Sequence, residues 1–573
     1  MPSHTSSSKS HGSARILVPG LATGPIIFSD VPLSFMLGVD PESGVVIDNH
    51  HPLNGTPLGN TVLAIPCGRG SCSGSGAILE LLMAGNAPAA LIFQKPEEIL
   101  TLGVLIARTM FSKSIPVLQV EDAESFRRLA TAGSATITDS YLVVTGLDEF
   151  QLELSPTEAD KVLLTPKDKE ILEGLHGPAA KMAMKMIVSY AALQGADTLV
   201  DVSQVHIDAC IYVGKSSLLI PQRLHAVNGK FAVPATCNSL SVDRLRWREL
   251  GADPELSIAS SQIGDLYLAM GATQSFTCAP YLLETKPEFG AQIGWAESNA
   301  VVFANSVLGA RTQKYPDYVD VFIALTGRAP YAGCHQTEGR IPKLRIDVPQ
   351  LDGWDESVFP LLGYHIGGLL GSEIPLIYGL EMSSPTIADL KAFGAGFATS
   401  SSAPMFHIRG VTPEACSFEL PKHHPNHFQL ETSSLHATWK QLNSATSGPV
   451  DVVSLGNPHF ALEEFARLAE LCRDRRKKGS VEFIITTSQQ TYKEALAEGY
   501  LEILEQFGAR LITDTCWCMI QEPVIPPQAR VIMTNSAKYA HYGPGMVRRG
   551  FLFGGLAACV EAACAGEHVV CEP

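Results

Sequence analysis

The sequence predicts an α/β protein in which a small N-terminal β/α domain precedes a larger, multi-layer α/β region. Short apolar runs rich in β-branched residues alternate with amphipathic segments of helical period, which is typical of layered α/β folds. With 573 residues, the chain exceeds what one hydrophobic core can serve, so we expect more than one domain. A content of 46% hydrophobic and 17% charged residues is typical of a globular chain.

The N-terminal part is predicted to contain a tail, a small domain and a linker. Residues 1–14 are rich in Ser and His and poor in apolar side chains, so we expect a disordered tail that is not a secretory signal. Residues 15–147 are predicted to form the small β/α domain. Its expected strands lie between Gly and Pro turns at 16–18, 45–47, 61–65, 90–93 and 116–120. Residues 148–163 are acidic and lack a clear pattern, which favours a linker.

Residues 164–573 are predicted to form the larger α/β region. Thr165 followed by Pro166 is typical of a helix N-cap with Pro at the first helical position. Buried strands are expected between the helices at 198–202, 319–325, 450–455 and 481–486. The polar clusters of this region fall at strand ends and turns, where α/β proteins place their chemistry.

Charge and cysteine content exclude several classes of function. The formal charge of -16 disfavours a nucleic-acid surface, which needs basic stripes. No apolar run is long enough to cross a bilayer, so we expect no membrane partner. The number of cysteines, 13, is odd, and their spacing does not match a disulfide framework. This indicates reduced thiols in an intracellular protein. We therefore expect a cytoplasmic location.

Two segments offer thiols in similar polar, Pro-punctuated settings. One contains Cys516-Trp517-Cys518 and the other contains Cys278 before Pro280. Three thiolates are one short of the four that hold an ordinary iron–sulfur cluster, so one iron would keep the open position that a Lewis acid needs. The alternative interpretation is that all three are buried apolar cysteines, which are common in protein interiors.

The segment 66–76 follows the strand expected at 61–65 and precedes a helix expected to begin near Ala77. Its glycines allow successive backbone N–H groups to form a nest at a helix N-terminus, which suits an anion. The pattern matches neither a phosphate-binding P-loop nor a dinucleotide fingerprint. What remains is a site for a carboxylate or an alkoxide, with Arg69 as the cation. A closely packed loop of small residues is the alternative.

Further polar clusters lie in the larger region at strand ends and before turns. They contain His206 and Asp208, Thr236 and Asn238, Glu297, Ser298 and Asn299, and Ser536 and Lys538. The cluster at 297–299 precedes an apolar helix, so it could also serve only as an N-cap.

Together these segments resemble the aconitase X family. The matching motifs occur in the family's order at 68–75, 205–208, 277–281, 297–300, 513–516 and 534–539, and the resemblance extends from about Arg15 to Gly554. It implies a small swivelling domain fused in front of a large aconitase-type α/β catalytic region, where many members have two separate subunits.

The resemblance implies a hydro-lyase that removes water from a hydroxy acid with an iron–sulfur cluster. The cluster ligands would be Cys278, Cys516 and Cys518, and a 2Fe–2S cluster is favoured over a 4Fe–4S cluster. One branch of the family acts on cis-3-hydroxy-L-proline and another, archaeal, branch acts on mevalonate 5-phosphate. The archaeal pattern has Cys where this chain has Asn457 and an aliphatic residue at the position of Cys518. The hydroxyproline branch therefore fits better.

In this interpretation Ser71 is the base for the α-proton and Arg69 stabilises its alkoxide. The residues expected to bind the hydroxy amino acid substrate are Gly70, Ser73, His206, Asp208, Thr236, Asn238, Glu297, Ser298, Asn299, Ser536 and Lys538. Mevalonate 5-phosphate dehydration and a non-catalytic iron–sulfur or redox-sensing protein are the alternatives. The oligomeric state stays open.

Overall fold

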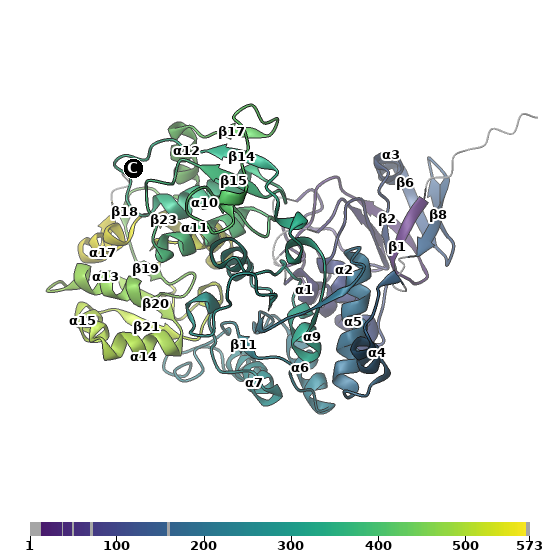
Figure 1. Ribbon diagram of the computed structural model, residues 1–573, viewed down its shortest axis with the longest axis horizontal. Helices are drawn as coiled ribbons and strands as arrows, with labels where there is room; N and C mark the ends of the chain where they lie inside the picture. Colours follow the sequence, from purple (N-terminus) through teal and green to yellow (C-terminus); the bar gives the residue numbers. More distant parts are fainter. Residues whose placement is uncertain (1–12, 37, 49–50, 69–72, 157–160, 569–573) are drawn as a thin grey trace, which may run out of the picture.

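The computed structural model describes residues 13–568 except 37, 49–50, 69–72 and 157–160. Its N-terminal part is a closed barrel with the strand order β1-β5-β4-β3-β2-β6-β7-β8. These strands are β1 (Ser13–Val18), β2 (Ala22–Phe28), β3 (Val62–Ile65), β4 (Ala90–Phe93), β5 (Val117–Gln119), β6 (Ala132–Ile137), β7 (Tyr141–Gly146) and β8 (Phe150–Pro156). Helices α1 (Gly74–Ala84) and α2 (Ile99–Phe111) connect the parallel strands β3, β4 and β5, and α3 (Ala123–Arg128) follows β5. Figure 1 shows this part in purple and blue.

The barrel includes residues that the sequence assigned to the tail and the linker. Strand β8 lies inside the segment 148–163 and pairs with both β7 and β1, which closes the barrel. Its apolar side chains alternate with polar ones, and Leu152 and Leu154 are buried. Because the segment is acidic, the alternation of apolar and polar residues in it was interpreted as a linker and not as a strand. The expected strand at 45–47 forms only isolated bridges, at Val45 and Val46.

The larger region begins with helices packed around two small sheets. Thr165 caps α4 as predicted, and it shares a capping box with Asp168. Strand β10 (Val205–Ile207) lies parallel to and between β11 (Ala235–Cys237) and β12 (Gly294–Trp295), and β9 (Leu199–Asp201) pairs with β13 (Arg328–Pro330). The helices are α4 (Pro166–Glu173), α5 (Pro178–Leu193), α6 (Lys215–Ala226), α7 (Pro254–Met270), α8 (Ser298–Phe303) and α9 (Val319–Thr326).

The strand predicted at 319–325 is wrong, because these residues form helix α9. All eight residues of α9 are buried, so the segment has no polar face and its apolar run looks like a buried strand. The helix lies between two residues in left-handed backbone conformation, Tyr318 with φ 78° and Gly327 with φ 70°.

Two further α/β layers follow. The first is a parallel sheet in the order β16-β15-β14-β17, and the second is a parallel sheet in the order β21-β20-β19-β22-β23. The first contains β14 (Leu344–Asp347), β15 (Pro375–Tyr378), β16 (His407–Ile408), β17 (His427–Gln429), α10 (Val358–Leu369), α11 (Ile387–Ser400) and α12 (Thr432–Leu442). The second contains β19 (Val452–Leu455), β20 (Glu482–Thr487), β21 (Arg510–Thr513), β22 (Val531–Thr534), β23 (Gly550–Phe553), α13 (Leu462–Cys472), α14 (Gln489–Ala497), α15 (Tyr500–Phe507), α16 (Ala537–Val547) and α17 (Leu556–Ala565). Figure 1 shows them in green and in yellow-green.

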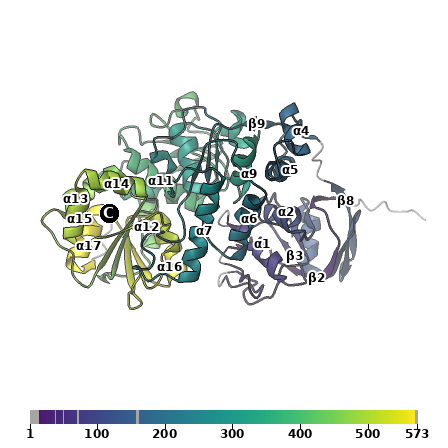
Figure 2. The ribbon, with the colours of Figure 1, turned by 90° about the horizontal axis from the view of Figure 1, so that it is seen from below.

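The barrel docks on the first helices of the larger region. Helix α1 contacts α6, and α2 contacts α5, as Figure 2 shows from below. The Tyr190 hydroxyl donates a hydrogen bond of 2.5 Å to Glu98 Oε2 on the barrel side, and the backbone N–H of Ser216 donates one of 2.8 Å to Glu80 Oε2. Helix α1 therefore lies against the larger region. Across the described ranges, no helix is both long and apolar enough to cross a membrane.

Candidate functional site

The predicted site residues of the larger region follow the carboxyl ends of parallel strands from two different sheets. Asp208 and Asn238 come directly after β10 and β11. The segment 456–459 follows β19, Cys516 follows β21, and Ser536 follows β22. In open α/β sheets this edge is where ligands bind. The two sheets face each other there, because Leu240 forms a parallel bridge with Thr515.

The three predicted thiols lie together at this junction. The Cys516 thiol hydrogen-bonds to Cys518, and both influence the same cation, Lys538. Cys278, on the loop that follows α7, is 7% exposed and acts electrostatically on Cys516 and Lys538. The backbone N–H of His459 donates to Cys278 Sγ over 3.3 Å.

The thiols differ in acidity. Burial raises the pKa of Cys278 to about 12. The hydrogen bond between Cys516 and Cys518 raises the pKa of Cys516 and lowers the pKa of Cys518 to about 6. Cys518 also accepts a hydrogen bond of 3.6 Å from Asn457 Nδ2. Cys518 is therefore the more acidic thiol of this pair.

The three cysteines form a donor set of the kind that an iron–sulfur cluster uses. Among the described residues, no group of three or more His, Cys, Asp or Glu side chains is arranged to hold one metal ion. A cluster distributes its thiolates over more than one iron, and convergent soft sulfur ligands with N–H donors to the sulfurs are its usual environment. Cys278, Cys516 and Cys518 are three sulfur groups of this kind, and the side chain of Asn457 and the backbone N–H of His459 donate to Cys518 and Cys278.

A buried ion pair lies next to the thiols. Lys538, in the first turn of α16, places Nζ 3.2 Å from Glu297 Oε1. Burial alone would lower the pKa of Lys538, but the carboxylate of Glu297 and the thiols outweigh it and raise that pKa well above its ordinary value. Glu297 Oε2 also accepts from the N–H of Ala300, so Glu297 caps α8 as well as pairing with the cation. The site thus holds a fixed ammonium group beside three thiols.

Asn299 and Ser536 hold the loops that carry these groups. Asn299 accepts from the Tyr281 hydroxyl over 2.9 Å and donates to the carbonyl oxygen of Cys278 over 3.1 Å. Ser536 donates to the carbonyl oxygen of Asn457 over 2.5 Å and caps α16. Both side chains therefore position the cysteine and asparagine loops. Ser298, the first residue of α8, is partly buried.

His206 is fully buried and both ring nitrogens bind other protein groups. Nε2 donates to the carbonyl oxygen of Thr277 over 3.0 Å, and Nδ1 accepts from the Thr236 hydroxyl over 2.8 Å. Burial lowers the pKa of His206 to about 4, so the ring is neutral. It supports the residue that precedes Cys278, whereas the sequence interpretation gave His206 a contact with substrate.

Asp208 and Asn238 form a buried pair beside these residues. The Asn238 side-chain amide donates to Asp208 Oδ1, and the backbone N–H of Asp208 donates to the carboxylate of Asp320. Burial, followed by the charges of Asp317 and Glu297, raises the pKa of Asp208 well above its ordinary value. A protonated carboxyl here can donate a hydrogen bond as well as accept one.

Of the predicted loop in the barrel domain, Arg69, Gly70 and Ser71 lie outside the described residues. The structure describes the residues on both sides of this loop. An added Cβ at Gly68 would lie 2.8 Å from Glu97 Oε1, so the loop packs closely against this side chain, and Ser73 is the N-cap residue of α1. Gly76, one turn into α1, faces Tyr318 and Val213 of the larger region.

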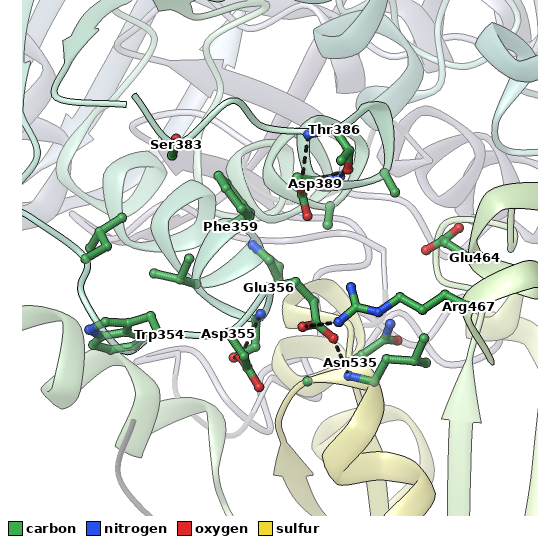
Figure 3. Close-up of a pocket in the computed structure, with 18 of the residues that line it drawn as sticks. Trp354, Asp355, Glu356, Phe359, Ser383, Thr386, Asp389, Glu464, Arg467 and Asn535 are labelled. Carbon is green, nitrogen blue, oxygen red and sulfur yellow. Dashed lines mark hydrogen bonds and ion pairs between the residues drawn. The ribbon is translucent and has the colours of Figure 1, made fainter. Parts of the chain in front are cut away.

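A cavity of about 500 Å³ lies elsewhere, between the N-terminal ends of α10, α11, α13 and α17 (Figure 3). It contains none of the predicted site residues. Its carboxylates already have structural partners: Glu356 accepts from Arg467 and from the N–H of Leu556, and Asp389 caps α11. A second cavity of about 20 Å³ adjoins it through Glu464 and Asn535 and reaches Asn457.

Comparison with protein families covers nearly the whole chain. The aconitase X swivel domain matches residues 11–145, and the aconitase X first, second and third domains match 161–338, 342–440 and 450–565. This chain belongs to the aconitase X family.

Two similar proteins carry the name cis-3-hydroxy-L-proline dehydratase. One, from Hypocrea jecorina, is 49% identical over 97% of this chain and 96% of its own length. The other, from Pseudomonas aeruginosa, is 48% identical over 96% of both chains. The crystal structure of Thermococcus kodakaraensis aconitase X in its holo-form is similar with a TM-score of 0.63 and 29% identity, and the match covers 70% of this chain and 100% of that one.

The sequence interpretation missed His459, Thr277 and Thr515, which connect the cysteine loops. His459 Nε2 donates to the carbonyl oxygen of Thr515 over 2.9 Å, and Nδ1 lies 3.3 Å from Thr277 Oγ1. The sequence hints at them by position, since His459 lies four residues after the end of β19 and the threonines directly precede Cys516 and Cys278.

Proposed function

We propose that this protein dehydrates cis-3-hydroxy-L-proline to Δ1-pyrroline-2-carboxylate. The main support is the near-full-length similarity to two proteins named for that activity, at 49% and 48% identity. The site agrees with it, because Asn457 and Cys518, the two positions that favour the hydroxyproline branch, are in contact beside the other thiols.

The reaction requires a base for the α-proton, an acceptor for the leaving hydroxyl and an anchor for the carboxylate. Loss of the α-hydrogen and the β-hydroxyl as water leaves an enamine, and its tautomer is the cyclic imine Δ1-pyrroline-2-carboxylate. The proton and the hydroxyl leave together as one water molecule, so no oxidant or reductant is needed.

We assign the anchor to Lys538. Its ammonium group is fixed by Glu297 and lies beside the thiols, so a substrate carboxylate bound to it would hold the ring next to the metal site. The buried Asp208–Asn238 pair is the candidate partner of the ring nitrogen, because a carboxyl group can accept its N–H.

Cys278, Cys516 and Cys518 would hold the iron–sulfur cluster, for which we propose the 2Fe–2S form. When bound, a cluster with an open iron position supplies a Lewis acid for the leaving hydroxyl. The protein's own contribution is to hold the thiols in place through Asn457 and His459.

We assign the base to Ser71 on the barrel domain. Serine is a weak base at its ordinary pKa, so it would act as an alkoxide stabilised by Arg69 and the N–H groups of the loop. The flanks of this loop, Gly68 and Ser73, belong to the domain whose helix α1 lies against the larger region. Base and thiols would then approach the substrate from two different domains.

The function is tested by anaerobic purification followed by a substrate screen. Cis- and trans-3-hydroxyproline, cis- and trans-4-hydroxyproline and mevalonate 5-phosphate are each assayed for loss of water. Turnover of cis-3-hydroxy-L-proline supports the proposal. Turnover of mevalonate 5-phosphate instead replaces it, and iron–sulfur absorption without any turnover indicates a sensor.

Replacing Ser71 by alanine is expected to lower turnover by about a hundredfold or more while the visible absorption and substrate binding persist, since loss of a general base has this scale. The measurement is steady-state turnover together with exchange of the substrate α-hydrogen in deuterated solvent. Ser140→Ala, at an exposed turn of the same domain, is the comparison and should leave turnover unchanged. Near wild-type exchange in the Ser71→Ala variant removes Ser71 from the role of base.

Replacing Lys538 by glutamine is expected to lower kcat/KM about 30-fold, mainly through KM, because a charge-assisted hydrogen bond to the carboxylate is worth about 2 kcal/mol. Arg467→Gln, which breaks an exposed pair with Glu356, removes the same charge away from the site and should leave kcat/KM unchanged. A Lys538→Gln variant with unchanged KM contradicts the assignment of the anchor.

A further inference from the structure

One histidine connects the two cysteine-bearing loops of the larger region. His459 lies in the segment after β19 and is buried, with 1% of its surface exposed. Its backbone N–H donates to Cys278 Sγ over 3.3 Å, and its carbonyl oxygen accepts from Lys391 Nζ over 2.9 Å. Lys391 is itself paired with Glu464, which caps α13. The backbone of His459 is therefore anchored behind the thiols.

The ring of His459 spans the gap between the loops. Nε2 lies 2.9 Å from the carbonyl oxygen of Thr515, the residue before Cys516. A carbonyl oxygen can only accept, so Nε2 carries the ring proton and Nδ1 is left as an acceptor. Nδ1 lies 3.3 Å from Thr277 Oγ1, the residue before Cys278, so the hydroxyl of Thr277 donates to it.

Thr277 is held from both sides. His206 Nε2 donates to its carbonyl oxygen over 3.0 Å, while its hydroxyl donates to His459. His206 in turn accepts from Thr236 on β11. A continuous chain of hydrogen bonds thus runs from Thr236 through His206, Thr277 and His459 to Thr515, and it crosses from the first sheet of the larger region to the last.

We infer that His459 is a positioning residue that fixes the spacing between Cys278 and the Cys516–Cys518 pair, and so determines how tightly this protein retains its cluster. The inference rests on the cysteine ligand set of the proposed function. Outer groups that orient metal ligands typically account for 10- to 100-fold in metal affinity or activity. Cys278 lies on the loop after α7, where the N–H of Thr277 donates to Cys237 of β11, whereas Cys516 follows β21. The spacing between the two cysteines therefore depends on a residue that bridges the two loops.

The test measures iron release, which does not depend on the substrate. Wild type and His459→Phe are reconstituted anaerobically, and transfer of iron to the chelator bathophenanthroline is followed over time. Phe fills the space of the ring but removes both ring hydrogen bonds, so we expect iron release about 10- to 100-fold faster. We also expect a changed electron paramagnetic resonance spectrum of the reduced cluster.

Two further variants separate this effect from general loss of stability. His459→Gln keeps an N–H donor and a carbonyl acceptor and should partly restore iron retention; it also serves if His459→Phe does not fold. His335→Phe is the matched control, because His335 is equally buried and bonds through both ring nitrogens, to Gln292 and Tyr315, which lie outside the predicted site. It should destabilise the fold without accelerating iron release from folded protein.

The coupling between the ring and the Cys278 loop is checked with Thr277→Val. Since Thr277 and His459 act through one hydrogen bond, the double variant should release iron little faster than His459→Phe alone. Iron release at the wild-type rate in both His459 variants overturns the inference while leaving the proposed function intact. A wild type that holds iron but turns over no substrate refutes the function and still allows the release test. A wild type that binds no iron overturns both.

Discussion

Alanine in place of Cys518 is expected to remove the visible iron–sulfur absorption and reduce turnover to the background level. Cys518 is the thiol whose pKa is lowered, to about 6, through the hydrogen bond from Cys516, and it receives the amide of Asn457 at 3.6 Å. Loss of one thiolate from a set of three leaves too few ligands to hold the cluster. Iron content, the absorption spectrum and turnover measure the outcome.

The comparison for this variant is Cys559→Ala. Cys559 is fully buried in α17, within the same α/β unit as Cys518, and burial also raises its pKa. Its removal should cost stability through a small cavity and leave iron content unchanged. Full iron and full activity in Cys518→Ala would show that the ligand set is wrong.

The fold could be predicted best where a short buried strand was flanked by Gly or Pro turns. Strands β3, β4, β19 and β20 lie within one or two residues of their predicted positions. Local pattern failed where burial was uniform, as in α9, where eight consecutive buried residues leave no polar face to reveal the helical period. The local pattern also failed to predict β8, for a different reason. This strand is stabilised by pairing with β1, which lies more than a hundred residues earlier in the chain.

In the candidate site, too, the local sequence identified individual polar residues, but their roles depend on contacts with residues far away in the chain. Glu297 was read both as a possible helix cap and as a site residue, and the structure shows a capping carboxylate that also pairs with Lys538. His206 was found as a polar residue at a strand end, but only its contact with Thr277, about seventy positions away, reveals a supporting role. The role of His459 depends on contacts with Thr277, which lies far earlier in the chain, and with Thr515, which lies later. A single sequence carries no periodic signal for such contacts.

The largest selectivity is expected between the two isomers of 3-hydroxy-L-proline. In the cis isomer the hydroxyl and the carboxylate are on one face of the ring, so the α-hydrogen and the hydroxyl are on opposite faces. In the trans isomer the α-hydrogen and the hydroxyl share a face. We expect kcat/KM for the cis isomer to exceed that for the trans isomer by at least about three orders of magnitude, or roughly 4 kcal/mol at the transition state.

The expected selectivity follows from the proposal that the base and the metal-binding thiols belong to different domains. Ser71 belongs to the barrel domain, whereas Cys278, Cys516 and Cys518 lie at the junction of two sheets of the larger region. With the carboxylate held by Lys538, a base on one side and an acceptor of the hydroxyl on the other can serve only a ring whose two departing groups are on opposite faces. Misplacing a reacting group by about 1 Å can already cost a hundredfold, and presenting the wrong face is a larger error.

The trans isomer also provides the control for binding. It carries the same carboxylate and ring nitrogen, so it should act as a competitive inhibitor with an inhibition constant close to the KM of the cis isomer, while it releases little or no product. Selectivity would then arise in the chemical step and not in recognition by Lys538. Comparable turnover of both isomers would mean that base and metal site approach the ring from the same side, and the roles assigned to Ser71 and the three thiols would have to be given up together.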